Sequence, residues 1–318
     1  MKITALAGGI GAAKFLLGLS QVVPPGDITI ISNTGDDVEL HGLHVSPDLD
    51  TVVYTLAGLS DESRGWGLEG DSFECLSWLS RYGEPPWFNL GDRDLATHIH
   101  RTEMLKSGCS LTEATAHISE SLGVQPRVLP MTDVYTPTFV ITDEGEMHFQ
   151  EYFVRRRCEP RVKAIRFANI ESSRPAPGVE DAILEADAVV ICPSNPFISI
   201  GPILSVPGIL EALKRASAVT LAITPIVGGK ALKGPAADML RDLGHEVSAR
   251  GVARLYREFL DLFVLDTRDA AERSDIEALG MQVVDADTVM TTLEDKTRLA
   301  GRIVGVLEEY MRAGAHCV

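Results

Sequence analysis

Short apolar runs alternate with segments of helical spacing along most of this chain. Runs with the length of buried strands occur at residues 2–7, 27–32, 187–192 and 219–224. Helical segments lie between these runs, as crossovers between parallel strands require, because the chain must return to the same end of the sheet. The pattern predicts the α/β fold class, with a Rossmann-like, doubly wound and mostly parallel sheet.

The stretch from residue 65 to residue 128 differs from this pattern, because its apolar residues recur at helical spacing. We interpret 65–128 as a helical insertion that caps the sheet within a single α/β domain spanning 1–318. Inside it we expect helices at 72–81, 92–106 and 111–122. After it we expect strands at 138–142, 147–153, 162–167, 262–265 and 281–284 and a final helix at 292–312.

Composition limits what the protein can bind. With 318 residues, 45% of them apolar, the chain can bury a substantial core. No basic stripe offsets its formal charge of −16, so we expect no nucleic-acid partner and no membrane surface. No apolar run reaches the roughly 18 residues of a membrane span. The scattered cysteines argue against disulfides and structural zinc and favour a cytoplasmic protein; they are Cys75, Cys109, Cys158, Cys192 and Cys317.

A glycine-rich turn follows the first predicted strand and opens a helix. Gly9 and Gly11 let the backbone approach an anion, and free N–H groups at the helix start attract it. With Lys14 in the next turn, this predicts a phosphate cradle. A nicotinamide site is disfavoured, because Ser32 and Asn33 stand where an acidic residue would bind the ribose. No GxxxxGK[ST] run occurs, which disfavours a nucleoside triphosphatase of that type.

Two acidic clusters follow the second predicted strand. Asp36 and Asp37 come directly after it, and Asp48 and Asp50 open the next helical segment, where either can cap the helix. Caps and solvated loop charges are the ordinary explanation in an acidic protein. Carboxylates beside a phosphate cradle, however, would repel the phosphate unless a cation lay between them. The juxtaposition therefore favours a divalent metal site.

Two more loops follow predicted parallel strands, at the edge where open α/β sheets bind ligands. Ser194 and Asn195 lie in one loop, and Lys230 and Lys233 lie in the other. The lysines can neutralise phosphate, and Asn195 can hydrogen-bond a base or a phosphate oxygen. Ordinary turn chemistry also places such residues in loops, so this alternative stays open.

The histidines form no recognisable zinc motif. His41 and His44 lack the surroundings of a His-Glu-x-x-His helix. His98 and His100 are two residues apart on a predicted helix and therefore face different directions. We expect no zinc site among them.

Together these motifs resemble those of a known family, the 2-phospho-L-lactate transferases of coenzyme F420 biosynthesis. The resemblance covers nearly the whole chain and is weakest after about Val252. It is carried by residues 7–14, 33–37, 47–51, 65–67, 90–98, 148–155 and 193–196. Because so many separate motifs occur in the same order, we expect the chain to share that family's Rossmann-like fold and its activity.

The resemblance implies a Mg²⁺-dependent transferase. A phospholactyl or phosphoenolpyruvyl group would pass from a guanosine diphospho donor (LPPG or EPPG) to the deazaflavin Fo, which is 7,8-didemethyl-8-hydroxy-5-deazariboflavin. GMP would leave, and coenzyme F420-0 or its dehydro form would result. The native three-carbon acid stays open among phospholactate, phosphoenolpyruvate and phosphoglycerate, because these donors differ by few atoms. The resemblance also implies a homodimer.

Residue roles follow from the resemblance and this chemistry. We expect Asp37 and Asp50 to hold Mg²⁺ or to orient the attacking hydroxyl, with Asp36 and Asp48 as alternatives; the resemblance also suggests that Asp50 contacts the ribityl chain of Fo. The other expected binding residues are Gly9, Gly11, Lys14, Asn33, Asn89, Arg93, Ser194, Asn195 and Lys230. Of these, Asn89 and Arg93 lie in the loop 87–93, which we expect to cover the deazaflavin ring. The alternative function is a non-catalytic regulator that binds a nucleotide sugar with the same core fold.

Overall fold

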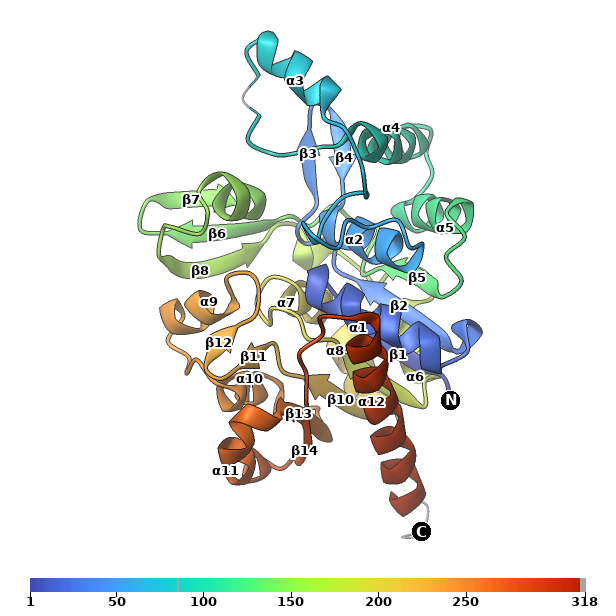
Figure 1. Cartoon of the computed structure of the whole chain (residues 1–318), viewed down its shortest axis with the longest axis vertical. Coiled ribbons are helices and arrows are strands. Elements are labelled where there is room, and N and C mark those ends of the chain that lie inside the picture. Colours follow the sequence, from blue (N-terminus) through green and yellow to red (C-terminus); the bar gives the residue numbers. More distant parts are fainter. Residues whose placement is uncertain (85, 315–318) are drawn as a thin grey trace.

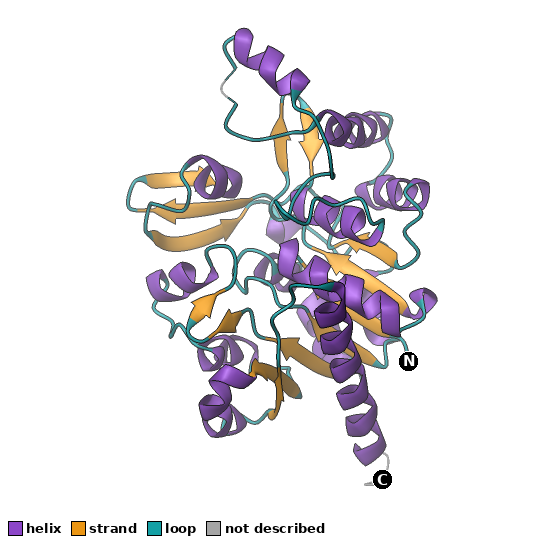
Figure 2. Cartoon of the chain, in the orientation of Figure 1, coloured by secondary structure: helices purple, strands orange, loops and turns teal. Residues whose placement is uncertain are grey.

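A seven-stranded parallel sheet forms the centre of the molecule (Figure 1, Figure 2). The computed structural model describes residues 1–84 and 86–314. The strand order is β14-β13-β10-β9-β1-β2-β5, and every neighbouring pair is parallel, which confirms the predicted fold class. The strands are β1 (Ile3–Ala7), β2 (Ile28–Ser32), β5 (Arg127–Pro130), β9 (Ala188–Ile191), β10 (Val219–Ile223), β13 (Leu262–Asp266) and β14 (Gln282–Ala286).

Helices bury both faces of this sheet. In β1, Ile3, Ala5 and Ala7 belong to one core, and Leu6 belongs to the other. Because both faces are buried, these strands are nearly continuous apolar runs, which made them predictable. The first core includes residues of α1 (Gly9–Val22), α2 (Pro47–Leu56), α5 (Leu111–Ser121) and α12 (Leu293–Gly314). The second includes residues of α6 (Val179–Leu184), α7 (Ile200–Ser205), α8 (Ile209–Arg215), α9 (Ala236–Asp242), α10 (Ala249–Tyr256) and α11 (Arg273–Glu277).

The first helix and the last described helix lie side by side (Figure 1). Gly18 of α1 faces the backbone at the start of α12, where an added Cβ would lie 2.1 Å from the carbonyl oxygen of Lys296. Only a residue without a side chain permits this approach. The close contact fixes α12, and the loop that precedes it, against the helix that carries the glycine turn.

Smaller units extend from the sheet. The β3–β4 hairpin lies near α3 and α4 at the top of Figure 1, and an antiparallel sheet of β6, β7 and β8 projects from one side. A further hairpin of β11 and β12 follows β10. Their bounds are β3 (Val38–Leu40), β4 (Leu43–Val45), α3 (Glu74–Arg81), α4 (Asp92–Lys106), β6 (Thr138–Thr142), β7 (Gly145–His148), β8 (Val162–Phe167), β11 (Ile226–Val227) and β12 (Lys230–Ala231).

Most expected elements are present, but three expectations need correction. The stretch 65–128 contains α3, α4 and α5 as expected, yet the unpredicted strand β5 begins at its end. The β3–β4 hairpin was also missed, because its strands have only three residues each. The strand predicted at 147–153 is wrong beyond His148, where Glu151–Arg155 forms a helical turn. Phe149 and Tyr152 are both buried, a spacing of three that suits a helix rather than a strand.

Ser46, rather than Asp48 or Asp50, occupies the N-cap position of α2. The two aspartates lie in the first turn of the helix instead, where they complement the helix dipole.

Two general expectations can be compared with the described residues. Their four cysteines are all free thiols, and Cys317 lies outside the described residues. Within 1–84 and 86–314, none of the helices combines the length and the apolar character that crossing a bilayer requires.

The strand order reverses between β1 and β9. From β1 the chain continues to β2 and β5 on one side of the sheet, and from β9 it continues to β10, β13 and β14 on the other. Loops that leave neighbouring strands in opposite directions open a crevice at the carboxyl ends of those strands. The glycine turn after β1 and the Ser194–Asn195 loop after β9 meet at this crevice.

Candidate active site

A cavity of about 600 Å³ opens at the point where the strand order reverses. The glycine turn and the loops after β9 and β10 line one part of it, and residues of α2, α4 and the 149–154 segment line the rest. Its volume and its place in the fold are those of substrate sites in doubly wound proteins. The cavity is therefore the candidate active site.

Close packing explains the composition of the glycine turn. An added Cβ at Gly11 would lie 2.3 Å from the carbonyl oxygen of Pro193, and one at Gly8 would lie 2.7 Å from the carboxylate of Asp48. Gly9 has a φ of +71°, and α1 begins there without a side-chain cap. The backbone of Gly9 already hydrogen-bonds to the Asp48 carboxylate, and the N–H groups that follow it in the first turn of α1 border the cavity, where they can bind an anion.

Three lysines gather beside this turn. Lys14 and Lys233 line the cavity, and buried Lys296 pairs with Glu62 at 2.6 Å. The Lys14 Nζ atom donates a hydrogen bond to the carbonyl oxygen of Met290 at 3.1 Å. Burial, and then the charges of Lys233 and Lys296, lower the pKa of Lys14. A chain with a net charge of −16 thus concentrates positive charge in one part of the cavity wall.

Asp36 and Asp48 form a second feature of the wall, which we call the acidic pair. Asn33 Nδ2 donates to Asp48 Oδ2 at 2.8 Å and lies 3.5 Å from Asp36 Oδ1, while Gln150 Nε2 donates to Asp36 Oδ2 at 3.3 Å. Burial, and then the charges of Asp48 and Asp37, raise the pKa of Asp36 well above its ordinary value. Burial also raises the pKa of Asp48 to about 7. Only neutral donors, and no cation among the described residues, contact the acidic pair.

Asp37 lies behind the cavity rather than in its wall. Its Oδ2 atom accepts a hydrogen bond from Ser46 Oγ at 2.9 Å and lies 2.8 Å from His44 Nε2. Its Oδ1 atom is buried without a hydrogen-bond partner among the described residues. Burial raises the pKa of Asp37, although His44 opposes the shift. In this structure Asp37 ties the β3–β4 hairpin to the start of α2.

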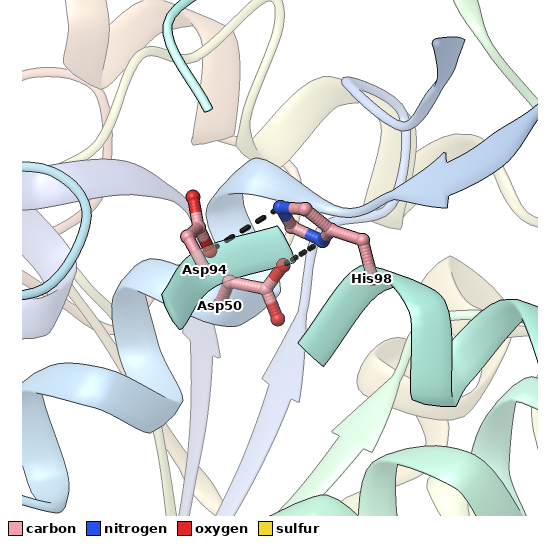
Figure 3. Close-up of side chains that lie close together, drawn as sticks. All are labelled: Asp50, Asp94 and His98. Carbon is pink, nitrogen blue, oxygen red and sulfur yellow. Dashed lines mark ion pairs between the residues drawn. The ribbon is translucent and has the colours of Figure 1, made fainter. Parts of the chain in front are cut away.

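A second group of carboxylates lies between α2 and α4. The Arg101 guanidinium binds both carboxylate oxygens of Asp50, with Nη1 3.0 Å from Oδ2. His98 lies between two carboxylates, with Nε2 3.2 Å from Asp94 and Nδ1 3.6 Å from Asp50 (Figure 3). The Tyr54 hydroxyl donates to Asp94 at 2.8 Å. Asp50, Asp94 and His98 are spaced closely enough to hold a metal ion, but Arg101 already supplies a cation there.

Apolar side chains complete the wall. Phe149 and Phe153 stack with their ring centres 5.5 Å apart and their planes 12° apart. On another side, the Arg64 guanidinium lies over the Trp66 ring at 5.0 Å. The apolar residues that line the cavity include Trp66, Phe88, Leu90, Phe149, Phe153, Val154 and Leu232. A flat aromatic ligand would find stacking partners on these walls.

The predicted site residues divide into two sets. Those that line the cavity are Gly9, Gly11, Lys14, Asp50, Asn89, Ser194 and Asn195. Those that do not are Asn33, Asp37, Arg93 and Lys230. Asn33 lies behind the acidic pair, and the Arg93 guanidinium turns away to the carbonyl oxygen of Gly70 at 2.8 Å. Lys230 is exposed on β12, and Lys233 lines the cavity in its place.

Sequence reasoning missed the group on α4. Asp94, His98 and Arg101 are spaced four and three residues apart, so they share one face of the helix. Tyr54 follows Asp50 by four residues on α2 in the same way. This spacing could have predicted that Asp94, His98 and Arg101 lie together. We compared His98 only with His100, which faces another direction, and therefore missed the group.

Comparison with known proteins now gives the family. A model of the family described as 2-phospho-L-lactate transferase CofD matches residues 3–303. The chain belongs to this family. Similar CofD-family proteins include the phosphoenolpyruvate transferase of Streptomyces griseus, which is 44% identical over 97% of this chain and 99% of that protein. The 2-phospho-L-lactate transferase of Methanosarcina acetivorans is 40% identical over 95% of this chain and 98% of that protein. The resemblance predicted from the motifs is confirmed, and the chain is a CofD-family phospholactate or phosphoenolpyruvate transferase.

A solved structure shares the fold of this CofD-family chain. It is that of a UPF0052 family protein from Bacillus halodurans, which aligns with a TM-score of 0.67 over 95% of this chain and 98% of that one. Only 17% of the aligned residues are identical, so the likeness concerns the fold alone.

Proposed function

We propose that this protein transfers a phospholactyl or phosphoenolpyruvyl group from LPPG or EPPG to the deazaflavin Fo, releases GMP and forms coenzyme F420-0 or its dehydro form. One observation carries the proposal. In a single cavity, a glycine turn with two lysines meets the acidic pair, in which Asp36 is buried and Asp48 half-buried and which no cation of residues 1–84 and 86–314 contacts. A diphosphate ester that binds with a divalent cation satisfies both features at once.

The donor diphosphate suits the basic part of the wall. Lys14, Lys233 and the first N–H groups of α1 can together neutralise its oxygens. The Ser194 hydroxyl donates to the carbonyl oxygen of Gly8 at 2.8 Å and so holds the glycine turn against the loop after β9. These contacts would fix the diphosphate in one position, which displacement in line with the leaving group requires.

The acidic pair fits Mg²⁺ better than the aspartates that we first expected to hold it. Two adjacent carboxylates, one buried and one half-buried, that contact no cation in the described part of the chain would be stabilised by a divalent ion, and Mg²⁺ prefers oxygen ligands. Asp50 is already paired with Arg101, and Asp37 with His44. We therefore propose that Asp36 and Asp48 hold Mg²⁺. When bound, the ion would neutralise charge that develops on the phosphoryl oxygens.

The chemical step is a displacement at phosphorus. The terminal ribityl hydroxyl of Fo attacks the phosphorus that carries the three-carbon acid and loses its proton through Asp50 to solvent, and the bond from this phosphorus to the bridging oxygen breaks, so that GMP leaves with the electron pair of that bond. Asp50 lines the cavity and orients the attacking hydroxyl by accepting its hydrogen bond. Trp66 and Phe88 provide apolar walls for the flat deazaflavin ring.

Release of GMP tests the proposal directly. The purified protein is incubated with Fo, Mg²⁺ and either LPPG or EPPG, and GMP and the deazaflavin product are separated by chromatography. We expect both products in equal amounts, and the ratio of kcat/KM values for the two donors identifies the preferred acid. Absence of product with LPPG, EPPG and a phosphoglycerate donor would contradict the proposal.

The alternative of a non-catalytic, nucleotide-sugar-binding regulator predicts a different result. Such a protein would bind the donor but would release no GMP when Fo is added. The similarity to named transferases over nearly the whole chain favours catalysis, and no observation on the described residues favours the regulator.

A further inference from the structure

The part of the wall between α2 and α4 holds a polar network, and Figure 3 shows three of its members, Asp50, Asp94 and His98. Arg101 is fully buried and does not line the cavity. Asp50, Tyr54, Asp94 and His98 all line it. The carboxylates therefore stand between a buried cation and the space in which substrates bind.

The interior contacts hold the two carboxylates in place. The Arg101 guanidinium engages both oxygens of Asp50, an arrangement that fixes the plane of this carboxylate. Burial alone would raise the pKa of Asp94, but its contacts with His98, Tyr54 and Arg101 lower this pKa overall. Burying the Arg101–Asp50 ion pair costs free energy, because both charges lose contact with water. Its presence beside the cavity therefore suggests a role in binding.

The network also leaves capacity for further hydrogen bonds on the cavity side. Arg101 Nη1 lies 3.3 Å from His98 Nδ1, and the other ring nitrogen, Nε2, lies 3.2 Å from Asp94 Oδ1. The alignment of this last contact is too poor for a full hydrogen bond. The other carboxylate oxygen of Asp94, Oδ2, receives no side-chain hydrogen bond from any described residue.

We propose that Arg101, His98 and Tyr54 are positioning residues that present Asp50 and Asp94 together as hydrogen-bond acceptors for neighbouring hydroxyl groups of the ribityl chain of Fo. This inference rests on the proposed function, because it takes Fo as the acceptor. It adds Asp94 as a second polyol ligand and assigns the buried residues behind it a task in acceptor selection.

The chemistry of a polyol matches this wall. Each hydroxyl of the chain donates one hydrogen bond, and two fixed carboxylates can accept from two or more of them. Charge-assisted hydrogen bonds of this kind are stronger than neutral ones. Phe88 and Leu90 line the cavity in the loop that leads to Asp94, so a flat ring attached to the chain would meet an apolar surface beside it.

A metal centre made of Asp50, Asp94 and His98 is the competing explanation, since their ligand atoms lie within 4.8 Å of one another. Arg101 argues against it. Its guanidinium contacts both Asp50 and His98, and a divalent cation placed among them would be repelled by this charge.

Binding of two acceptors tests the proposal. One is Fo, and the other is an analogue whose chain keeps the terminal hydroxyl but lacks the secondary hydroxyls; deazaflavin fluorescence reports both affinities. We expect the wild-type protein to bind Fo at least about tenfold more tightly than the analogue, because the analogue offers Asp50 only its terminal hydroxyl and leaves Asp94 without a hydroxyl partner. Arg101→Lys should reduce this preference about tenfold, since lysine keeps the charge but not the forked geometry. Tyr54→Phe should reduce it about threefold.

Matched substitutions elsewhere provide the controls. Tyr256 is buried in α10 with no hydrogen-bond partner for its hydroxyl among the described residues, so Tyr256→Phe should leave the preference unchanged. Arg273→Lys replaces another carboxylate-paired arginine, which binds Asp285 outside the cavity, and should also leave the preference unchanged. A structural defect would weaken binding of Fo and of the analogue equally.

The outcomes separate this inference from the proposed function. Loss of the Fo preference in Arg101→Lys and Tyr54→Phe supports it. An unchanged preference, or an equal loss of affinity for both acceptors, overturns it while leaving the transferase proposal intact. If the wild-type protein binds neither acceptor and releases no GMP, the proposed function fails first.

Mn²⁺ binding, followed by electron paramagnetic resonance, tests the competing metal centre. We expect His98→Asn to retain the Mn²⁺ affinity of the wild-type protein within about twofold, because the network already contains its cation. A loss of tenfold or more would identify His98 as a metal ligand and overturn the positioning role.

Discussion

The cavity contains two groups of buried aspartates that differ in what stands behind them. Asp36 and Asp48 receive hydrogen bonds from the neutral amides of Gln150 and Asn33. Asp50, by contrast, is bound by a buried guanidinium. Aspartate side chains in one cavity therefore have different surroundings: neutral amides contact the first group, and a cation contacts the second. In our proposals, the first group binds a cation, and the second, which Arg101 already pairs, accepts hydrogen bonds from the substrate.

Asp50→Asn should have the largest effect on stability, because it leaves Arg101 charged, buried and without a carboxylate. Breaking such a pair costs about 3–5 kcal/mol of unfolding free energy. Denaturant unfolding measures this loss, and GMP release should fall as well. Retained binding of Fo with lost turnover would assign Asp50 to orienting the attacking hydroxyl. An unfolding free energy equal to that of the wild-type protein would contradict the buried pair.

In contrast to Asp50→Asn, Asp48→Asn should increase the stability of the metal-free protein. Removing one of two adjacent buried charges relieves repulsion, so the melting temperature without metal should rise. Turnover should fall about 10³-fold, because the proposed metal site loses a ligand. Mn²⁺ titration and thermal unfolding check both effects. Unaltered Mn²⁺ affinity would exclude Asp48 as a ligand.

The stability of the metal-free protein should depend on pH through Asp48. Burial raises the pKa of Asp48 in the folded protein from 3.8 to about 7, so the folded state binds a proton more tightly than the unfolded state. This contribution is fully present below about pH 4 and is lost as the pH rises towards about 7, with a total on the order of a few kcal/mol. Unfolding curves at several pH values should show the loss, and Asp48→Asn should flatten it. Stability that rises over this range in both proteins would contradict the assignment.

Substitutions of Lys233 and Lys230, the two lysines near β12, should have smaller and different effects on KM for the donor. Lys233→Met should raise KM for the donor about tenfold, because one charge-assisted contact to the diphosphate is lost. Lys230→Met should change KM by less than twofold, since Lys230 is exposed and outside the cavity wall. Steady-state kinetics with varied donor measures both values. The reverse result would restore the sequence-based choice of Lys230.

Local pattern accounts for what could be predicted. Except for β5, the strands of the central sheet are encoded by neighbouring residues, and so is the glycine turn, so their positions and the place of Gly9, Gly11 and Lys14 in the cavity wall could be inferred. The choice between Lys230 and Lys233 depends on the path of one short loop, which composition does not reveal.

Long-range contacts account for what could not be predicted. Arg101 pairs with Asp50 across 51 positions of sequence, and this contact changes the expected role of Asp50. Likewise, Asp37 is adjacent to Asp36 in sequence, yet it turns to His44 instead of the cavity. Such pairings arise from the packing of α2 against α4 and of the β3–β4 hairpin, and only the folded arrangement defines them.

The contact between α1 and α12 has a consequence for protein synthesis. Lys14 emerges early from the ribosome, whereas Thr288 and Met290, which line the same cavity, emerge near the end. Until these two residues are made, the cavity lacks part of its wall, and Lys14 lacks the Met290 carbonyl oxygen to which it donates. The cavity can therefore be complete only after nearly the whole chain has been synthesised.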